Sequence, residues 1–252
     1  MDFCYTNSKY IKLSISFMPK FKLMKQIIIY FYVLSTFIFS NTIYHIPIEG
    51  TIDLGLPPYI ERSIKEAEDN NAESIIFEVN TFGGRVDAAT QIKDAILDSK
   101  IPTIAFINKR AISAGALISL SCEKIFMASG ATIGATTAVD MSGNKASEKV
   151  ISYMREEMAA TAEKRGRNKF IARGMVDEEL EFPSKVKKEY VSQNGETDTI
   201  KTIIHFLIIE NDTIHVDDIE GRKQGNLITL TTEQSLKYKI ADNKADTFDD
   251  VL

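Results

Sequence analysis

The chain of 252 residues is short of several residue types, and each shortage narrows what it can be. It has no tryptophan and only two cysteines, Cys4 and Cys122, too few for a disulfide framework or a four-cysteine zinc site. Its three histidines are His45, His205 and His215. Basic residues number 30 against 35 acidic ones, which gives no support for nucleic-acid binding. With 44% hydrophobic and 26% charged residues, the composition is that of a globular domain.

Charge and hydrophobicity are unevenly distributed along the chain. Residues 1–41 hold five lysines and one aspartate, a net charge of +4, which leaves −9 for the rest. From Met24 the chain reads MKQ, then an apolar run of 13 residues, Ile27–Phe39, then SNT, which is the layout of a secretory signal peptide. A helix of this run spans about 20 Å, less than the roughly 30 Å hydrocarbon core of a membrane.

We therefore expect residues 1–41 to be an N-terminal leader, either a signal peptide or an uncleaved anchor, with translation starting at Met18 or Met24. The alternative is a buried core helix. Residues 42–252 would then form the functional domain, exported to the periplasmic or extracytoplasmic face of a membrane that the leader contacts.

In the body of the chain, strand patterns alternate with helix patterns. This alternation predicts an α/β fold with a mostly parallel sheet and right-handed crossovers. The expected strands are 42–48, 74–80, 101–107 and 124–128, and the expected helices are 57–70, 85–99 and 149–165, with Gly166 ending the last. After residue 170 a small α+β region is expected, with strands at 202–210 and 227–230 and a short helix at 232–239.

Three loops rich in small residues follow the expected strands. The first contains Gly83 and Gly84 before a helix, the second, residues 111–116, places Ser113 among alanines and a glycine, and the third is residues 130–135. Each has a plainer interpretation: a tight turn, a helix-capping serine, or a simple reversal of the chain. Because all three lie at the carboxyl ends of parallel strands, where open α/β sheets hold their sites, their combination indicates one active site.

The runs VNTFGG, AISAGA and GATIGA together resemble the Clp-protease/crotonase superfamily. The runs KVISYM and KRGRN, and the late run LITLTTEQSLKYKIAD, are more particularly similar to the NfeD-type membrane-bound serine proteases, from about residue 46 to residue 252. The resemblance implies a spiral of ββα units and a protease domain that pairs a serine with a lysine. Phe82 stands where the family has proline, so the glycine loop is expected to be less rigid here.

Matched residue by residue, the resemblance makes Ser113 the nucleophile and Lys149 the general base. Gly83 and Gly84 take the oxyanion-hole position, and we expect Ala114, Gly115 and Gly134 to contact the substrate. The resemblance also implies a hydrophobic polypeptide substrate, a stomatin- or prohibitin-like membrane protein as partner, and a homodimer or higher oligomer. No metal or cofactor is implied.

The scarcity of histidine bears on the mechanism independently. A Clp-type Ser-His-Asp triad needs a histidine about 25 residues after the serine, where this chain reads TTAVD from Thr136. A lysine can replace histidine as the base if it is neutral, which burial and the positive end of a helix both favour. We therefore expect Lys149 to be desolvated, with Lys145 and then Lys124 as alternative bases.

The preferred interpretation is a membrane-associated serine endopeptidase with a Ser-Lys dyad. A catalytically weak or inactive scaffold of the same fold, binding stomatin-like proteins, is the first alternative. A crotonase-like acyl-CoA enzyme is disfavoured because no glutamate lies beside the Gly83 loop and because an export leader does not suit a CoA enzyme. Cys122 is expected to be a small buried core residue.

Overall fold

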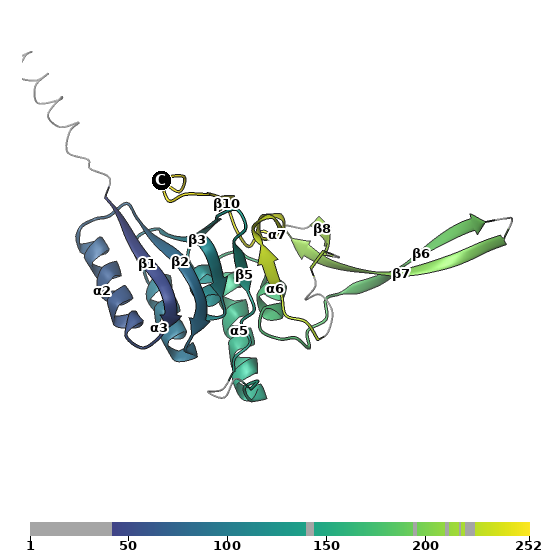
Figure 1. Cartoon of the computed structure of the whole chain (residues 1–252), viewed down its shortest axis with the longest axis horizontal. Coiled ribbons are helices and arrows are strands. Elements are labelled where there is room, and N and C mark those ends of the chain that lie inside the picture. Colours follow the sequence, from purple (N-terminus) through teal and green to yellow (C-terminus); the bar gives the residue numbers. More distant parts are fainter. Residues whose placement is uncertain (1–41, 140–143, 194–195, 210–211, 217, 220–224) are drawn as a thin grey trace, which may run out of the picture. The chain divides into compact units, whose positions relative to one another are not determined.

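The computed structural model describes residues 42–139, 144–193, 196–209, 212–216, 218–219 and 225–252, with backbone only from 188 to 200 and at 209 (Figure 1). The expected leader, residues 1–41, and both candidate start methionines lie outside the described residues. Among the described helices, none is both long enough and apolar enough to cross a membrane.

Seven of the described strands form one sheet, and its first four strands are parallel neighbours in chain order. The two-residue strand β10 extends this order parallel to β4, while β5 lies parallel to β3 and antiparallel to β9. These strands are β1 (Ile43–Ile52), β2 (Ser74–Gly84), β3 (Thr103–Ile112), β4 (Lys124–Met127), β5 (Thr132–Gly134), β9 (Thr229–Thr231) and β10 (Asn243–Lys244).

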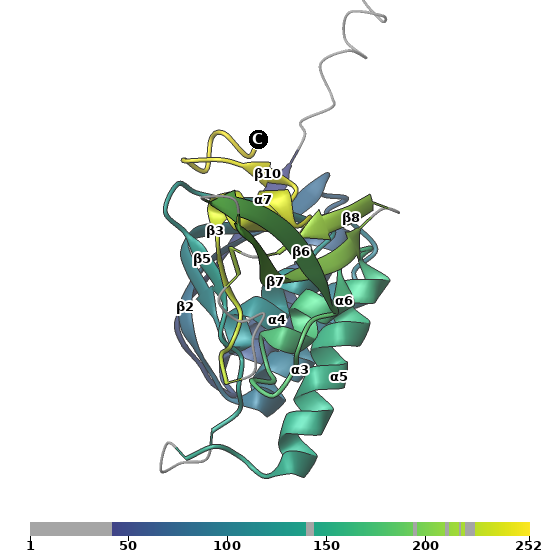
Figure 2. The same cartoon turned by 90° about the vertical axis from the view of Figure 1, so that its right-hand side faces the viewer.

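Helices follow the strands as the alternation predicted. In the view of Figure 2, α3, α4 and α5 lie on one side of β2, β3 and β5. The apolar faces expected for the first two helices are buried, with Ile60 and Ile64 on one and Ile92 and Ile96 on the other. The helices are α2 (Leu56–Asp69), α3 (Val86–Leu97), α4 (Ala114–Ser121), α5 (Glu148–Lys164), α6 (Lys169–Gly174) and α7 (Thr232–Lys237).

Two of the expected loops contain strand structure. Strand β2 continues to Gly84 rather than ending at Asn80, because Thr51 and Ile52 of β1 pair with Gly83 and Gly84. The third loop contains β5, which pairs with β3 and with β9 from the late part of the chain. Sequence periodicity missed β5 because three residues are too few to show alternation.

Strand β3 pairs with two different strands along its length, and this brings two of the three small-residue loops together. Its first half pairs with β4, and its last residues, Arg110–Ile112, pair with β5. Ile112 lies opposite Gly134, so the loop after β3 is held beside the loop after β5. Figure 1 shows that β1 and β2 point to the end of the sheet at which α5 begins.

The late region holds a three-stranded antiparallel sheet in the order β6-β7-β8. It consists of β6 (Ser184–Gln193), β7 (Glu196–Ile209) and β8 (Asp212–His215). Strand β7 begins before the predicted residue 202, and α7 matches the predicted short helix apart from its last residues. The fold prediction is thereby confirmed: a mostly parallel α/β sheet with helices and a small late α+β region.

Candidate active site

Ser113 lies at the turn between β3 and α4 in a strained backbone conformation. Its φ of 55° and ψ of −119° are uncommon for any residue other than glycine. Its amide donates to the Gly134 carbonyl at 2.9 Å, and its own carbonyl accepts from the Ala116 amide at 2.9 Å. Although Ser113 occupies the N-cap position, its hydroxyl makes no capping hydrogen bond. A strained strand-to-helix turn that presents an uncommitted hydroxyl is the geometry of a nucleophile elbow.

At the end of β2 the neighbouring atoms lie so close that only glycine fits at positions 83 and 84. Gly83 has a φ of 107°, and a Cβ built on it would lie 2.5 Å from the Ser113 Cβ and 3.0 Å from Oγ. A Cβ on Gly84 would lie 2.1 Å from the Ile52 carbonyl oxygen. The two glycines, which the sequence predicted to form a turn, are the last residues of β2, and Gly83 brings this backbone against the Ser113 side chain.

The backbone amides near Ser113 differ in whether they are already engaged. The Gly83 amide donates to Thr81 Oγ1 at 2.9 Å, and that hydroxyl donates to the Gly50 carbonyl. The Arg85 amide donates to the Ile52 carbonyl of β1 at 2.8 Å. Because successive amides of an extended chain point to opposite sides, the Gly84 amide faces away from β1. The Ala114 amide is in the first turn of α4, where amides have no partner within the helix.

A cavity of about 390 Å³ opens in front of Ser113. It is lined from the ends of β1 and β2, from the start of α3, from the turn at Ser113, from the chain after β5, and from one residue of α5. The lining residues are Thr51, Ile52, Asp53, Gly84, Arg85, Val86, Ala89, Ser113, Ala114, Thr136, Thr137, Ala138, Val139 and Met154.

Of the three residues expected to contact the substrate, only Ala114 lines this cavity. A Cβ on Gly115 would lie 2.5 Å from Thr81 Cγ2, so this glycine lets α4 pack closely on β2. Gly134, with a φ of 135°, packs against the backbone at Ile228 and accepts the Ser113 amide through its carbonyl. The geometry thus supports packing roles for Gly115 and Gly134.

Lys149 is exposed at the second residue of α5 and does not line the cavity of Ser113. The desolvation expected for this lysine is therefore not present in this conformation. It lies one helical turn before Tyr153, whose side chain lines a neighbouring cavity together with Arg85 and Val86. Arg85 and Val86 also line the cavity of Ser113. The face of α5 that carries Lys149 and Tyr153 therefore adjoins the site.

The alternative lysines are engaged elsewhere. Lys145 forms an ion pair with Glu178 at 2.7 Å, and this hydrogen-bonded carboxylate raises the pKa of Lys145, which opposes service as a base. Lys124 begins β4, at the opposite end of the strands from Ser113, and pairs with Asp242.

None of the three histidines lines the cavity of Ser113 as the described residues form it. His45 pairs with Glu78 near the start of β1, while His205 and His215 belong to β7 and β8. Over the same described ranges, no three His, Cys, Asp or Glu side chains gather in a group that could hold a metal ion.

A model of the family described as "NfeD1b, N-terminal domain" matches residues 42–202. The chain belongs to this family. It is 41% identical over 142 residues to membrane protein NfeD1b of Bacillus subtilis, covering 56% of this chain and 32% of the relative. It is 31% identical over 177 residues to the membrane-bound protease PH1510 of Pyrococcus horikoshii, covering 67% of this chain and 40% of that protein. The chain thus spans less than half the length of these curated relatives.

Solved structures agree with this assignment. The structure of a serine-to-alanine variant of the 1510-N membrane-bound stomatin-specific protease matches this chain with a TM-score of 0.61 at 26% sequence identity. The match covers 85% of this chain and 84% of that protein. A lysine-to-alanine variant of the same protease, in complex with a substrate peptide, also gives 0.61 at 26% identity, with coverages of 84% and 78%. ClpP1 from Listeria monocytogenes matches with a TM-score of 0.53 at 17% identity, over 82% of this chain and 94% of the ClpP1 chain. This likeness shows a shared fold. The resemblance inferred from the sequence is confirmed.

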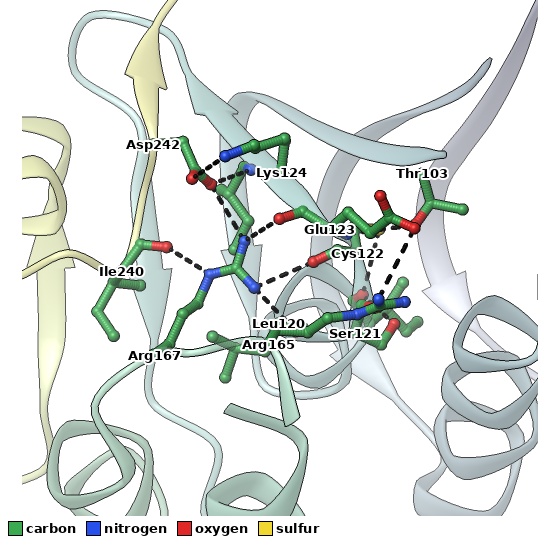
Figure 3. Close-up of polar contacts among 12 residues, drawn as sticks. Thr103, Leu120, Ser121, Cys122, Glu123, Lys124, Arg165, Arg167, Ile240 and Asp242 are labelled. Carbon is green, nitrogen blue, oxygen red and sulfur yellow. Dashed lines mark hydrogen bonds and ion pairs between the residues drawn. The ribbon is translucent and has the colours of Figure 1, made fainter. Parts of the chain in front are cut away.

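The KRGRN run of this NfeD1b-type domain has a structural explanation, shown in Figure 3. The buried Arg167 guanidinium donates to the carbonyls of Cys122, Glu123 and Ile240 and pairs with Asp242 at 3.2 Å. It therefore joins the end of α5 to the start of β4 and to the late chain. Cys122 is fully buried beside this network, and burial raises the pKa of its thiol to about 12, as expected for an unreactive core residue.

Phe82, the departure from the family pattern, is 74% exposed. The Arg110 guanidinium lies over its ring at 4.4 Å from the centroid. This cation–π contact fixes the ring against β3, so the loop gains a restraint from a side chain where a proline would have restrained the backbone.

Sequence reasoning missed Thr136. This residue is 1% exposed and lines the cavity, and its Oγ1 has no hydrogen-bond partner among the described residues. Threonine after a strand is too common to attract attention, and the signal exists only once the fold buries the hydroxyl.

Proposed function

We propose that this chain is a serine-type endopeptidase in which Ser113 is the nucleophile. The observation that supports this most directly is the backbone of Ser113, a lining residue of the cavity. Its positive φ is held by hydrogen bonds of its amide and its carbonyl, while its hydroxyl makes no capping hydrogen bond within the described residues. Such strain persists where the surroundings enforce it and is concentrated at functional sites. Homology to the protease PH1510 supports peptide hydrolysis as the reaction.

In this proposal Lys149 is the general base. Its neutral amine would enter the cavity from the adjoining face of α5, take the proton from Ser113 Oγ, and return it to the leaving amine. The exposed position of Lys149 then represents a resting arrangement, and substrate or a second subunit would complete its burial. The lysine variant solved for the 1510-N protease supports a lysine in this role.

The oxyanion would be held by the amides of Gly84 and Ala114. Both residues line the cavity with Ser113, whereas the Gly83 amide is engaged by Thr81. The Ala114 amide also adds the positive end of α4, which favours developing negative charge. Gly83 contributes by leaving room for the serine side chain.

The substrate we propose is a hydrophobic segment of a membrane or exported protein, with a stomatin-like protein as the first candidate. This follows the description of the 1510-N protease as stomatin-specific. We also propose an exported location on the extracytoplasmic face of the membrane, a leader that contacts the membrane, and assembly as a homodimer or higher oligomer.

The test is proteolysis of unstructured casein by the full chain purified in detergent. Ser113→Ala and Lys149→Ala should each lower turnover by at least about a thousandfold, because nucleophile and base act as one unit. Lys145→Ala is the matched control, a lysine four residues earlier that pairs with Glu178, and it should change turnover by less than about twofold.

A circular dichroism spectrum and melting curve of each variant establish that the fold is intact. Loss of activity in Ser113→Ala alone would show that Lys149 is not the base. Equal activity in Ser113→Ala and wild type would end the proposal that Ser113 is the nucleophile.

A second candidate is a scaffold of the same fold that binds stomatin-like proteins without cutting them. The exposed Lys149 and the engaged Gly83 amide favour it. A folded wild-type chain that leaves casein and a stomatin-derived peptide intact, yet binds the peptide equally well with Ser113→Ala, would support the scaffold over the peptidase.

A further inference from the structure

The hydroxyl of Thr136 is a buried polar group that the reaction as proposed does not use. Leaving a hydroxyl without a partner in a protein interior is unfavourable, so buried polar groups are nearly always paired. Thr136 is 1% exposed, and among the described residues its Oγ1 is without a partner. Its partner is therefore expected to be a group that enters the cavity.

The backbone around Thr136 is fixed on both sides. Its amide donates to the Met175 carbonyl at 2.6 Å, and the preceding Ala135 amide donates to the Ile228 carbonyl at 3.0 Å. Gly134, one residue earlier, accepts the amide of Ser113. The hydroxyl is thus held at a set position relative to the serine.

The neighbouring threonine provides a contrast. Thr137 Oγ1 donates to the Val176 carbonyl at 2.7 Å, so its hydroxyl serves the fold. Two adjacent threonines therefore have different environments. The Thr137 hydroxyl has a backbone partner, whereas the Thr136 hydroxyl, buried in the cavity wall, has none among the described residues.

Thr136 also lies on the wall through which a base from α5 must approach. Residues 136–139 and Met154 of α5 form one side of the cavity, and the Ala146 amide, just before α5, donates to the Ala138 carbonyl. The start of α5 is thereby tied to this wall. An amine that enters the cavity from the start of α5 would do so beside the wall to which Thr136 belongs.

We propose that Thr136 is a positioning residue for the general base. Its Oγ1 accepts a hydrogen bond from Nζ of Lys149, which directs the lone pair of the neutral amine toward Ser113 Oγ. When the Oγ–H bond of Ser113 breaks, the proton forms a new N–H bond on Nζ and the amine becomes an ammonium, still held by Thr136. This inference rests on the proposed function.

Other titratable groups face the same cavity or flank the lysine. Asp53 and Arg85 line it, with the Arg85 guanidinium paired to Asp87, while Glu148 and Tyr153 are on α5. These groups are the same in wild type and in the variants below, so a difference in pH profile between them reports on Thr136.

The test measures nucleophile activation without a peptide. Ser113 attacks a fluorophosphonate probe, forming a P–O bond as the P–F bond breaks and fluoride leaves. The rate of this modification is followed by intact mass across pH in the full chain, for wild type, Thr136→Val, Thr136→Ser and the control Thr161→Val.

Thr136→Val should react about tenfold more slowly at its plateau, because a hydrogen bond to a group that becomes charged is lost. The midpoint of its acidic limb should move to lower pH, since the lost acceptor stabilised the ammonium more than the amine. Thr136→Ser should restore the rate and the midpoint. Thr161→Val, at a buried threonine of α5 that does not line the cavity and whose hydroxyl donates to the Glu157 carbonyl, should lower the melting temperature while keeping the pH profile of wild type.

The outcomes separate the two proposals. If wild type reacts at Ser113 and depends on Lys149, but Thr136→Val keeps the wild-type rate and profile, the positioning role is wrong and the peptidase proposal survives. In that case, a raised KM on casein with unchanged kcat would assign the hydroxyl to substrate binding. If wild type does not react at Ser113, both proposals are overturned.

Discussion

Four residues around Ser113 adopt positive φ angles, and two of them are not glycine. Ser113 and Ala135 have φ of 55° and 45°, and Gly83 and Gly134 have 107° and 135°. Each such conformation in a residue with a side chain costs of order 1–3 kcal/mol unless its surroundings enforce it. Here the amides of Ser113 and Ala135 are both hydrogen-bonded to carbonyls of neighbouring segments. The strain is therefore stored at the turn that presents Ser113, the proposed nucleophile.

At this scale Gly83→Ala should abolish the reactivity of Ser113. The added methyl would lie 2.5 Å from the Ser113 Cβ, so one of the two backbones must shift. The change should also reduce the free energy of unfolding by more than the roughly 1–2 kcal/mol that a left-handed alanine costs. Fluorophosphonate labelling and urea unfolding measure the two effects.

Gly130→Ala is the matched control for this prediction. Gly130 also has a positive φ, 75°, but a Cβ there meets nothing within 4 Å. It should show the conformational cost alone and keep normal labelling. Equal labelling of the two variants would mean that the close approach of Gly83 does not matter to the site.

The sequence predicted the positions of single residues where a motif determines the local backbone. It missed features that depend on the surroundings of a side chain in the folded domain. The positions of Ser113 and the glycine pair could be predicted because loops of small residues follow neighbouring parallel strands, which brings them to one end of the sheet. Their proposed catalytic roles came from the family resemblance. The hydrogen bond from the Gly83 amide to Thr81 could not be predicted, because it depends on the Thr81 side chain folding back toward the backbone two residues later. The exposure of Lys149 likewise depends on how the start of α5 is placed, which periodicity does not specify.

Between elements, Arg167 is the polar group that joins segments distant in sequence. It links the chain after α5, the α4–β4 connection and the residues before β10 through one buried guanidinium (Figure 3). Burial lowers the pKa of Arg167, and Asp242 and the surrounding carbonyls keep it charged. Periodicity predicted the helices and strands that this residue joins, but not the junction itself.

Replacing this arginine should destabilise the domain strongly. Arg167→Met leaves several buried carbonyls without this donor and removes the buried cation from Asp242, and breaking a buried ion pair from one side costs about 3–5 kcal/mol. Lys124→Met removes the other cation that pairs with Asp242, but that side chain is 61% exposed, and an exposed pair contributes about 0–1 kcal/mol. Urea unfolding followed by circular dichroism compares the two, and similar midpoints would contradict the role assigned to Arg167.

At the scale of the whole domain, the antiparallel sheet of the late region is separable from the site. Within the described residues, β6 pairs only with β7, and β7 only with β6 and β8. The far part of this hairpin extends away from the parallel sheet in Figure 1, whereas Leu207, near its base, is 2% exposed and belongs to the core. Stability should therefore depend on the base of the hairpin and not on its far part.

We expect the hairpin to be shortened without loss of the active site. Lys188 and Lys201 are directly paired, so replacing residues 189–200 by Asn-Gly closes the strands with a two-residue turn in the same register. The shortened chain should unfold at nearly the wild-type temperature and label at Ser113 at the wild-type rate. Leu207→Asp, which buries a charge at the base, should instead lower the melting temperature sharply. If shortening abolished Ser113 labelling while the chain stayed folded, the far part of the hairpin would have to act on the site, either within one chain or across a dimer.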